Sequence, residues 1–386
     1  MATRISWDMR DHAPGLLDGL GPRVVGELLG EVEAIARAAP VARSFRPLQD
    51  GRVVRPSGHQ RAYYLRLEAG GVVALKGTEV QAGDLDRAFD ELADDRLANQ
   101  RSVLEHFVVA EHKLPMALLH DEAIAEATMA FELQVAYLAR YRALARVPLP
   151  LLVLRWSDDD AAAFARRLQP RLSNRAQVIA HGLMARGLGI YVYFYPTLPE
   201  RLAQLPRTAG AGVDHRGFAA RYDTLATTRD PKQILERWLQ LFVRMLGLGY
   251  LPCNLAHIGT GQCVDPNNAV LDGGFVDLDS LQPIAPLDAA SFHETLVYSL
   301  ASLAGIVQHL LVGTTKLAFH AGMDPLSSLP MHAVCAKLGR LIEQEQASGV
   351  VFDPRLLAVF SPADPLDSLI ALCRQLLPPR VVASHV

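Results

Sequence analysis

Residues 61–77, RAYYLRLEAGGVVALKG, constrain the fold more than any other stretch of the chain. Two runs rich in β-branched and aromatic residues flank the tetrapeptide EAGG, and this pattern predicts an antiparallel β-hairpin. The second run ends in Lys76, whose ammonium group would be costly to bury without a partner. The hairpin therefore predicts a strand-rich region with a lysine that needs a carboxylate or a phosphate beside it.

The remaining patterns divide the chain into a strand-rich first part and a helix-rich second part. Short apolar runs at 149–156 and 189–195 predict two further buried strands. Amphipathic patterns predict helices over 21–39, 84–113, 120–146 and 230–249, and mainly helix after about residue 288. The polar, glycine-containing stretch 205–231 predicts a surface loop. These patterns favour an α+β fold.

Composition excludes some functions. The 386 residues carry a net charge of about −3, which gives no global electrostatic reason to expect a nucleic-acid or membrane partner. The four cysteines form no CxxC and no zinc-site spacing, so we interpret them as reduced thiols. The N-terminus has no apolar signal-peptide core, and we expect a cytoplasmic protein.

Residues 295–315 contain no Asp, Glu, Lys or Arg and are long enough to span a bilayer. Ser299, Ser302, Gln308 and His309 interrupt the segment, and it lacks an aromatic belt and a second span. We therefore interpret it as a helix buried within the protein.

A second hairpin, within residues 263–281 (CVDPNNAVLDGGFVDLDSL), carries the candidate chemistry. The Asp-Gly-Gly sequence at 272–274 suits a tight turn. Alternation along the second arm would place Asp277 and Asp279 on one face, and folding the arm back would bring Asn268 close to Asp277. An amide oxygen and a carboxylate are hard ligands that suit Mg²⁺, which usually takes one or two protein ligands.

The next helical pattern after Lys76 offers it a glutamate partner. RSVLEHFVVAEHKL contains Glu105 and Glu111, of which we favour Glu105. A strand lysine held by a helix glutamate, and followed much later by an Asn and an Asp in one hairpin, is a specific order of features. This order resembles the protein-kinase-like superfamily.

The resemblance implies a two-lobed fold with a small strand-rich N-lobe and a larger helical C-lobe. It covers about residues 50–300, in scattered motifs. By position, Lys76 would contact the nucleotide phosphates, Glu105 would hold Lys76, and Asn268 and Asp277 would bind Mg²⁺. Tyr193–Thr197 would form the hinge facing adenine, with Tyr193 and Tyr195 as nucleotide-binding residues. The implied division is a helical extension (1–45), an N-lobe (46–197) and a C-lobe (198–386).

Two features depart from that pattern. No glycine-rich loop is evident, although RPSGHQR with Gly58 stands at its place. Cys263 lies five positions before Asn268, where kinases usually carry the catalytic Asp of an HxD motif.

Within the superfamily, the chain distantly resembles selenoprotein O, a family of protein adenylyltransferases. That family also lacks the usual catalytic Asp and has the same spacing as Asn268 and Asp277. The resemblance implies that Arg155, in LLVLRW, lies near the phosphates. That family's proton acceptor corresponds to Asn267, which cannot act as a base, and we expect Asp265 to substitute for it.

The sequence thus predicts ATP- and Mg²⁺-dependent transfer of a phosphoryl or adenylyl group. The acceptor would be a hydroxyl or amine of a small molecule, a peptide or a protein. Two alternatives stay open. Cys263 and Asn267 are also what an inactive, nucleotide-binding pseudokinase would show. A metal hydrolase could instead use Asp265, Asp272, Asp277 and Asp279 as a carboxylate cluster, although Asp272 would lie in the turn.

Overall fold

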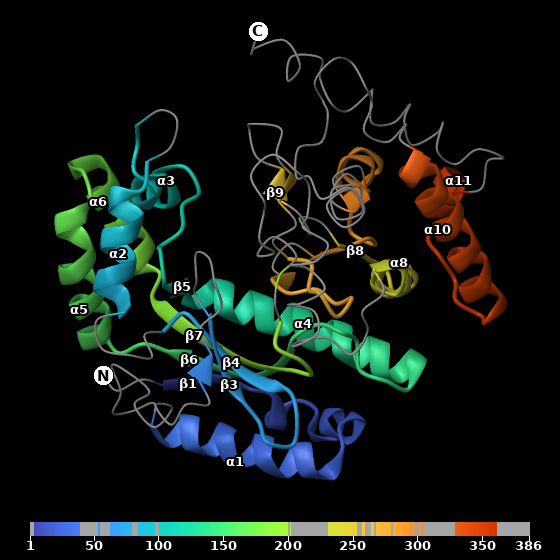
Figure 1. Cartoon of the computed structure of the whole chain (residues 1–386), viewed down its shortest axis with the longest axis horizontal. Helices are drawn as coiled ribbons and strands as arrows, with labels where there is room; N and C mark the ends of the chain where they lie inside the picture. Colours follow the sequence, from blue (N-terminus) through green and yellow to red (C-terminus); the bar gives the residue numbers. More distant parts are fainter. Residues whose placement is uncertain are drawn as a thin grey trace, which may run out of the picture. The chain divides into compact units, whose positions relative to one another are not determined.

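The computed structural model describes two compact units (Figure 1). The first comprises Met1–Leu144 and Pro148–Leu198, and the second Ala145–Val147 and Pro199–Val386. They are nearly equal in length rather than small and large. The described residues are 4–38, 53–54, 62–78, 84–96, 100–199, 201, 231–252, 257–258, 264–265, 268–278, 281–296, 299–300, 303 and 329–360.

The first unit is built on an antiparallel sheet of seven described strands. Their order is β1-β6-β7-β4-β3-β2, and β5 also pairs with β7. The strands are β1 (Arg4–Asp8), β2 (Val53–Val54), β3 (Ala62–Arg66), β4 (Val72–Lys76), β5 (Leu118–Leu119), β6 (Leu149–Arg155) and β7 (Leu188–Tyr195). The predicted β3–β4 hairpin, both later strands and the α+β fold are confirmed.

The N-terminal segment differs from the predicted helical extension. Helix α1 (Pro22–Ala38) is present, but β1 precedes it and pairs antiparallel with β6 at the sheet's edge. Two 3₁₀ turns, η1 (Met9–Asp11) and η2 (Pro14–Gly19), connect β1 to α1. Because β1 is hydrogen-bonded into the sheet, this segment belongs to the first unit.

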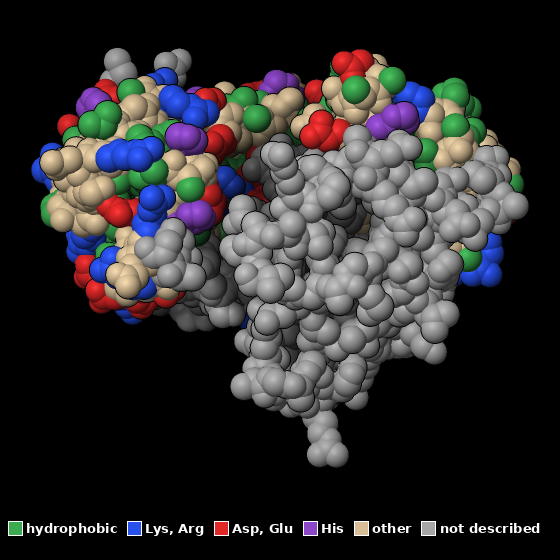
Figure 2. All heavy atoms as spheres, turned by 90° about the horizontal axis from the view of Figure 1, so that it is seen from above, with side chains coloured by type: hydrophobic (Ala, Val, Ile, Leu, Met, Phe, Trp, Pro, Cys, Tyr) green, Lys and Arg blue, Asp and Glu red, His purple; other side chains and the backbone are tan. Residues whose placement is uncertain are grey.

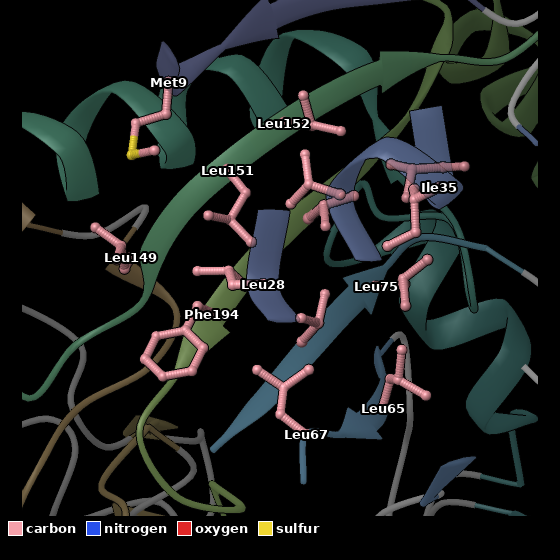
Figure 3. Close-up of a cluster of buried hydrophobic side chains, with 14 of the residues drawn as sticks. Met9, Leu28, Ile35, Leu65, Leu67, Leu75, Leu149, Leu151, Leu152 and Phe194 are labelled. Atoms are coloured by element: carbon pink, nitrogen blue, oxygen red, sulfur yellow. The ribbon is translucent and has the colours of Figure 1, made fainter. Parts of the chain in front are cut away.

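One face of the sheet packs against α1. Alternate residues of the central strands, including Val73, Leu75 and Phe194, join Leu28 and Ile35 of α1 in one apolar cluster (Figure 3). Burial of such a cluster is the main favourable term in folding.

Helix α1 also fixes the turn of the predicted hairpin. Both carboxylate oxygens of Glu27 accept 2.7 Å hydrogen bonds, one from the Glu68 N–H and one from the Ala69 N–H. These bonds satisfy two backbone donors in the turn and hold β3 and β4 against the helix.

The opposite face of the sheet packs against α4 (His120–Tyr141) (Figure 1). Small side chains let this helix approach closely. A β-carbon at Gly189 of β7 would lie 3.0 Å from the His120 Cα and 3.3 Å from the Ala123 Cβ. The residues of β4 and β7 that alternate with the α1-facing ones, among them Lys76 and Tyr191, therefore lie on the α4 side.

A cluster of shorter helices completes the first unit. The predicted helix over 84–113 is two helices, α2 (Asp84–Asp94) and α3 (Val103–Val109), which pack with α5 (Asp158–Leu168) and α6 (Asn174–Ala185) around Phe89 and Phe164. The α5 N-cap is Ser157, whose Oγ accepts a 3.1 Å hydrogen bond from the Asp160 N–H.

Ion pairs join α2 to the end of α5 and to η4 (Gln169–Arg171): Arg167 with Asp86 at 2.8 Å, and Arg171 with Asp90 at 2.6 Å. On the face shown in Figure 2, acidic and basic side chains of the described residues intermingle.

The second unit contains the predicted helix α8 (Pro231–Gly247), followed by β8 (Tyr250–Pro252), which pairs with β11 (Leu281–Pro283). Helix α10 (Leu329–Ala347) packs on α8, and α11 (Pro354–Phe360) follows it. A two-residue ladder joins β9 (His257–Ile258) to β10 (Val264–Asp265).

Two predictions fall on parts of the second unit that are not described. The loop predicted over 205–231, apart from Pro231 at the start of α8, lies outside the described residues, and so does most of the segment 295–315. No helix in the described part of the chain has both the length and the apolar content needed to cross a bilayer.

Candidate functional site

The strongest candidate feature in the first unit is a buried ion pair. The Nζ of Lys76, at the end of β4, lies 2.7 Å from the Oε2 of Glu126 on α4. The two side chains are only 6% and 2% exposed. Removing two charges from water costs free energy that their mutual attraction often does not recover, so such a pair adds little to the stability of the fold. We therefore treat it as a candidate functional feature.

The predicted partner of Lys76 is therefore wrong. Glu105 belongs to α3, which packs mainly on α2 and α6. There its Oε1 accepts a 3.0 Å hydrogen bond from the Ser173 N–H, next to the start of α6. This bond lowers the pKa of Glu105. Glu111, the other candidate, lies 3.4 Å from the His106 ring.

The sequence contains a signal that would have found Glu126. It lies on a stripe of α4 whose other members are mostly small or apolar: Ala123, Ala127, Ala130 and Leu133. A glutamate at three- and four-residue spacing from such residues faces the core. A buried cation beside it offsets the cost of keeping such a carboxylate charged in the core.

The chain turns sharply after Lys76, and the turn depends on Gly77. Its φ is +91°, and a β-carbon there would lie 2.6 Å from the Gly189 carbonyl oxygen. The Gly77 carbonyl accepts a 3.1 Å hydrogen bond from the indole N–H of Trp156. The end of the lysine strand is thus fixed by backbone geometry as well as by the ion pair.

Tyr193 and Tyr195 are buried on the α4 side of β7, the same side as Lys76. Their strand ends next to the division between the units, between Leu198 and Pro199. The register opposes Lys76 to Tyr191, so both predicted tyrosines lie further along β7.

Arg155 is exposed at the end of β6. Its Cα pairs with Gly189, two residues along β7 from the partner of Lys76. The guanidinium group lies close enough to His120, at the start of α4, to reinforce the lowering of the His120 pKa that burial causes. Arg155 therefore lies near the start of α4.

In the second unit, the predicted hairpin brings Asn268 and Asp277 together along the backbone. The Asn268 carbonyl accepts a 2.9 Å hydrogen bond from the N–H of Val276, which directly precedes Asp277. Ala269 and Phe275 form the adjacent bridge. Asn268 is 8% exposed, so its amide lies in a largely dry environment.

The second arm is not the regular strand that alternation predicted. Phe275 is the last described residue of this arm in a backbone bridge, and Asp277 adopts a left-handed conformation with φ of +57°. The burial pattern still alternates, because Val276 and Leu278 are buried and Asp277 is partly exposed. Aspartate is one of the residues that adopt this conformation most readily, and four other described non-glycine residues share it. Asp279 lies outside the described residues.

The turn of the hairpin is anchored by neighbours within the second unit. Arg146 donates a 2.6 Å hydrogen bond to the Asp272 carbonyl and accepts one from the Phe275 N–H. Trp238 of α8 donates its indole N–H to the Gly274 carbonyl at 3.0 Å. Gly273 is required here, since a β-carbon would lie 2.5 Å from the Arg237 Cβ. These contacts make the hairpin a rigid support for its open end.

The remaining acidic residues are placed less favourably. The Asp272 carboxylate is buried and accepts the Gly274 N–H, so it serves the turn, as expected against the hydrolase alternative. Asp265 is in β10, opposite His257, but its side chain is not described. Cys263 and Asn267 also lie outside the described residues. Within those residues, no three His, Cys, Asp or Glu side chains gather as a metal site.

Asn268 and Asp277 fit a Mg²⁺ ion by the chemistry of their donors. Both offer hard oxygen atoms, and a hydrogen-bonded backbone fixes one close to the other. The ion would complete its shell with water and phosphate oxygens, so two protein ligands are sufficient.

Comparisons with known proteins add little. No protein-family model matches the chain, and no curated protein matches it. Among solved structures, the chain is similar to the pseudokinase domain of BIR2, an immune regulator of the RLK/Pelle family. The identity is 12% and the TM-score 0.31, over 84% of this chain and 81% of that one. A TM-score this low carries no weight for fold or function, so the proposals below rest on the chain's own residues.

Proposed function

We propose that this chain is a kinase-like protein that binds ATP with Mg²⁺ and transfers a phosphoryl or adenylyl group. The observation that carries the proposal is the buried Lys76–Glu126 pair, joining a central strand to the helix packed on it. A strand lysine held by a helix glutamate is the arrangement with which kinases position nucleotide phosphates. Glu126 takes the role that the sequence had suggested for Glu105.

The order of strands also supports a kinase-like first unit. The lysine strand β4 lies between the hairpin strand β3 and β7, which leads out of the unit. Residues Tyr193–Thr197 therefore remain the proposed hinge that faces adenine. Arg155 is proposed to reach the phosphates from the end of β6.

The second unit would supply the metal ligands. Bound Mg²⁺ would neutralise charge on the phosphates and on the transferring phosphorus. Asn268 and Asp277 would hold it, and the rigid turn of their hairpin would keep both oxygens in place. Asp265 would orient or deprotonate the acceptor hydroxyl or amine. A strong base is not essential to a loose phosphoryl-transfer transition state, so Cys263 in place of the usual Asp is compatible with activity.

The distant resemblance to selenoprotein O leaves both the transferred group and the acceptor open. Adenylyl transfer would attack the α-phosphorus, and phosphoryl transfer would attack the γ-phosphorus. The acceptor could be a small molecule, a peptide or a protein. We propose a cytoplasmic location, in keeping with the reduced thiols expected from the sequence.

A second candidate is a nucleotide-binding pseudokinase. Cys263 and Asn267 favour it, and so does an ion pair between the proposed metal ligand Asp277 and Arg201, at 3.2 Å. Arg201 competes with a metal ion for the Oδ2 of this carboxylate. The two candidates share a nucleotide site and differ in whether the chain turns ATP over.

The test uses ATP labelled at the α or the γ position, incubated in parallel with the full chain, with and without Mg²⁺. Label transferred from the γ position only identifies a kinase, and label from the α position identifies an adenylyltransferase. ATP-dependent thermal stabilisation without transfer supports the pseudokinase. Absence of both transfer and stabilisation contradicts the proposal.

A matched variant shows that any signal comes from this site. Changing Lys76→Met and Glu126→Gln together removes both charges without leaving either one buried and unpaired. We expect the double variant to keep its fold and lose the ATP response. If the double variant keeps the full response to ATP, Lys76 and Glu126 are not part of a nucleotide site.

A further inference from the structure

Arg201 occupies an unusual place beside the proposed metal site. Its Nη2 lies 3.2 Å from the Oδ2 of Asp277, and the two side chains are 24% and 20% exposed. This ion pair lies within the second unit, to which both residues belong. Nothing in the sequence pattern had indicated a role for this arginine.

The backbone fixes Arg201 at this position. Arg201 forms an isolated antiparallel bridge with Val270, on the first arm of the hairpin. Asp277 follows the second arm, whose Val276 N–H is bonded to the Asn268 carbonyl. The backbone of Arg201 is therefore paired with the first arm of the hairpin. Its guanidinium group contacts the carboxylate of Asp277, which follows the second arm.

A guanidinium ion and a divalent cation compete for the same carboxylate. Both are attracted to the Asp277 oxygen, and they repel each other at the short distances that joint binding would require. A free divalent cation that takes the Oδ2 of Asp277 therefore displaces Arg201 from this partner. A nucleotide triphosphate changes the balance, because its oxygens match the planar fork of a guanidinium group.

We propose that Arg201 is a positioning residue that guards the metal site: it holds Asp277 until Mg²⁺ arrives together with a nucleotide, and then pairs with the phosphates. The proposal rests on the function proposed above, and it adds an order of binding. Before the metal enters, the Asp277 carboxylate is paired with the Arg201 guanidinium. Free divalent cations bind weakly, and the metal–nucleotide complex binds well.

The test measures Mn²⁺ binding by electron paramagnetic resonance, with and without the β,γ-imido analogue of ATP. The variant is Arg201→Gln, which removes the charge and keeps a polar side chain. The matched control is Arg244→Gln, because Arg244 forms a similarly exposed ion pair with Glu345 in the same unit, at 2.9 Å. Melting temperatures establish that each variant is folded.

We expect Arg201→Gln to bind free Mn²⁺ about tenfold more tightly than the wild type, which corresponds to losing one competing charge. The gain in Mn²⁺ affinity that the nucleotide analogue gives the wild type should shrink in this variant. Arg244→Gln should leave both values unchanged. Equal affinity of the wild type and Arg201→Gln for free Mn²⁺ overturns the guarding role.

One further variant separates failure of this inference from failure of the proposed function. Asp277→Asn should abolish Mn²⁺ binding with the nucleotide analogue. If it does so while Arg201→Gln has no effect, the metal site stands and the guarding role is overturned. If Mn²⁺ binding with the analogue is absent from the wild type, or is unaffected by Asp277→Asn, the metal site itself is refuted, and the role of Arg201 with it.

Discussion

The ammonium group of Lys76 donates a 2.7 Å hydrogen bond to the carboxylate of Glu126, fifty residues further along the chain. The pair connects the last residue of β4 to the second buried residue of α4. Because both side chains are almost completely buried, either charge would be costly to hold in the core without the other.

Removing one charge of this pair should be strongly destabilising. We expect Glu126→Gln to lower the free energy of unfolding by about 3–5 kcal/mol, since it leaves the Lys76 ammonium buried without its counter-ion. Chemical denaturation measures the change.

The control for Glu126→Gln is Glu105→Gln, which alters the other candidate glutamate. It weakens one partly exposed hydrogen bond to the Ser173 N–H and should cost only about 0.5–1.5 kcal/mol. Equal losses in the two variants would contradict the special position of Glu126.

Two glycines should respond to alanine in opposite directions. Gly77→Ala places a methyl group against the Gly189 carbonyl and Leu118, at positive φ, and should destabilise the protein by more than about 1 kcal/mol. Gly30, on an exposed face of α1, has no atom within 4 Å of its added β-carbon.

Gly30→Ala should therefore stabilise the protein by about 0.5–1 kcal/mol, through helix propensity. The melting temperatures of Gly77→Ala and Gly30→Ala, compared with that of the wild type, test both expectations. A stable Gly77→Ala protein would mean that the turn after Lys76 tolerates another geometry.

Stability should depend on pH through His120. Burial, reinforced by Arg155, lowers the pKa of this imidazole below its ordinary value of 6.5, and Asp121 opposes the shift. Because the folded-state pKa is the lower one, the contribution to stability is present above about pH 6.5 and is lost as the pH falls below it.

Denaturation at pH 7.5 and 5.5 should therefore show a smaller loss on acidification for His120→Gln than for the wild type. In Arg155→Gln, NMR titration should give a higher His120 pKa. An identical pH response of the wild type and His120→Gln would disprove the assignment.

The turn of the second hairpin should depend on Arg146. Arg146→Met removes the 2.6 Å hydrogen bond from its guanidinium to the Asp272 carbonyl and should cost about 1.5–3 kcal/mol. Faster hydrogen exchange at the amides of Val270 and Gly273 would accompany the loss.

The comparison variant is Arg237→Met, at the other arginine against this turn. The buried Nη1 of Arg237 has no hydrogen-bond partner among the described residues. Methionine keeps the apolar contact with Gly273, so this change should be close to neutral. If Arg237→Met were the more damaging of the two, our account of the turn would be wrong.

Local patterns predicted the strands and helices that local chemistry decides. The run VVALKG required a strand and a partnered lysine, and the α8 sequence has an apolar stripe with a proline at its start. Both elements formed as predicted. The partner of Lys76 was missed because it depends on which helix packs on the sheet. Proximity in sequence favoured Glu105, whereas packing placed the more distant Glu126 there.

The second hairpin shows the same limit on a smaller scale. Asp-Gly-Gly predicted the turn, and the turn brought Asn268 and the residues before Asp277 together. The positive φ of Asp277 could not be read from alternation, because it arises where pairing ends. Arg201 lies 76 residues before Asp277, and no periodicity links the two residues.

The assignment of Ala145–Val147 to the second unit has a practical consequence for dissecting the protein. The polypeptide passes from one unit to the other three times, so no single cut yields two complete fragments. A fragment ending at Leu198 would carry Arg146 without the Asp272 carbonyl and Phe275 amide that it bonds. A fragment starting at Pro199 would leave those same groups unsatisfied. We expect neither fragment to fold stably when it is expressed alone. Mixing the two fragments would restore the missing hydrogen bonds by complementation.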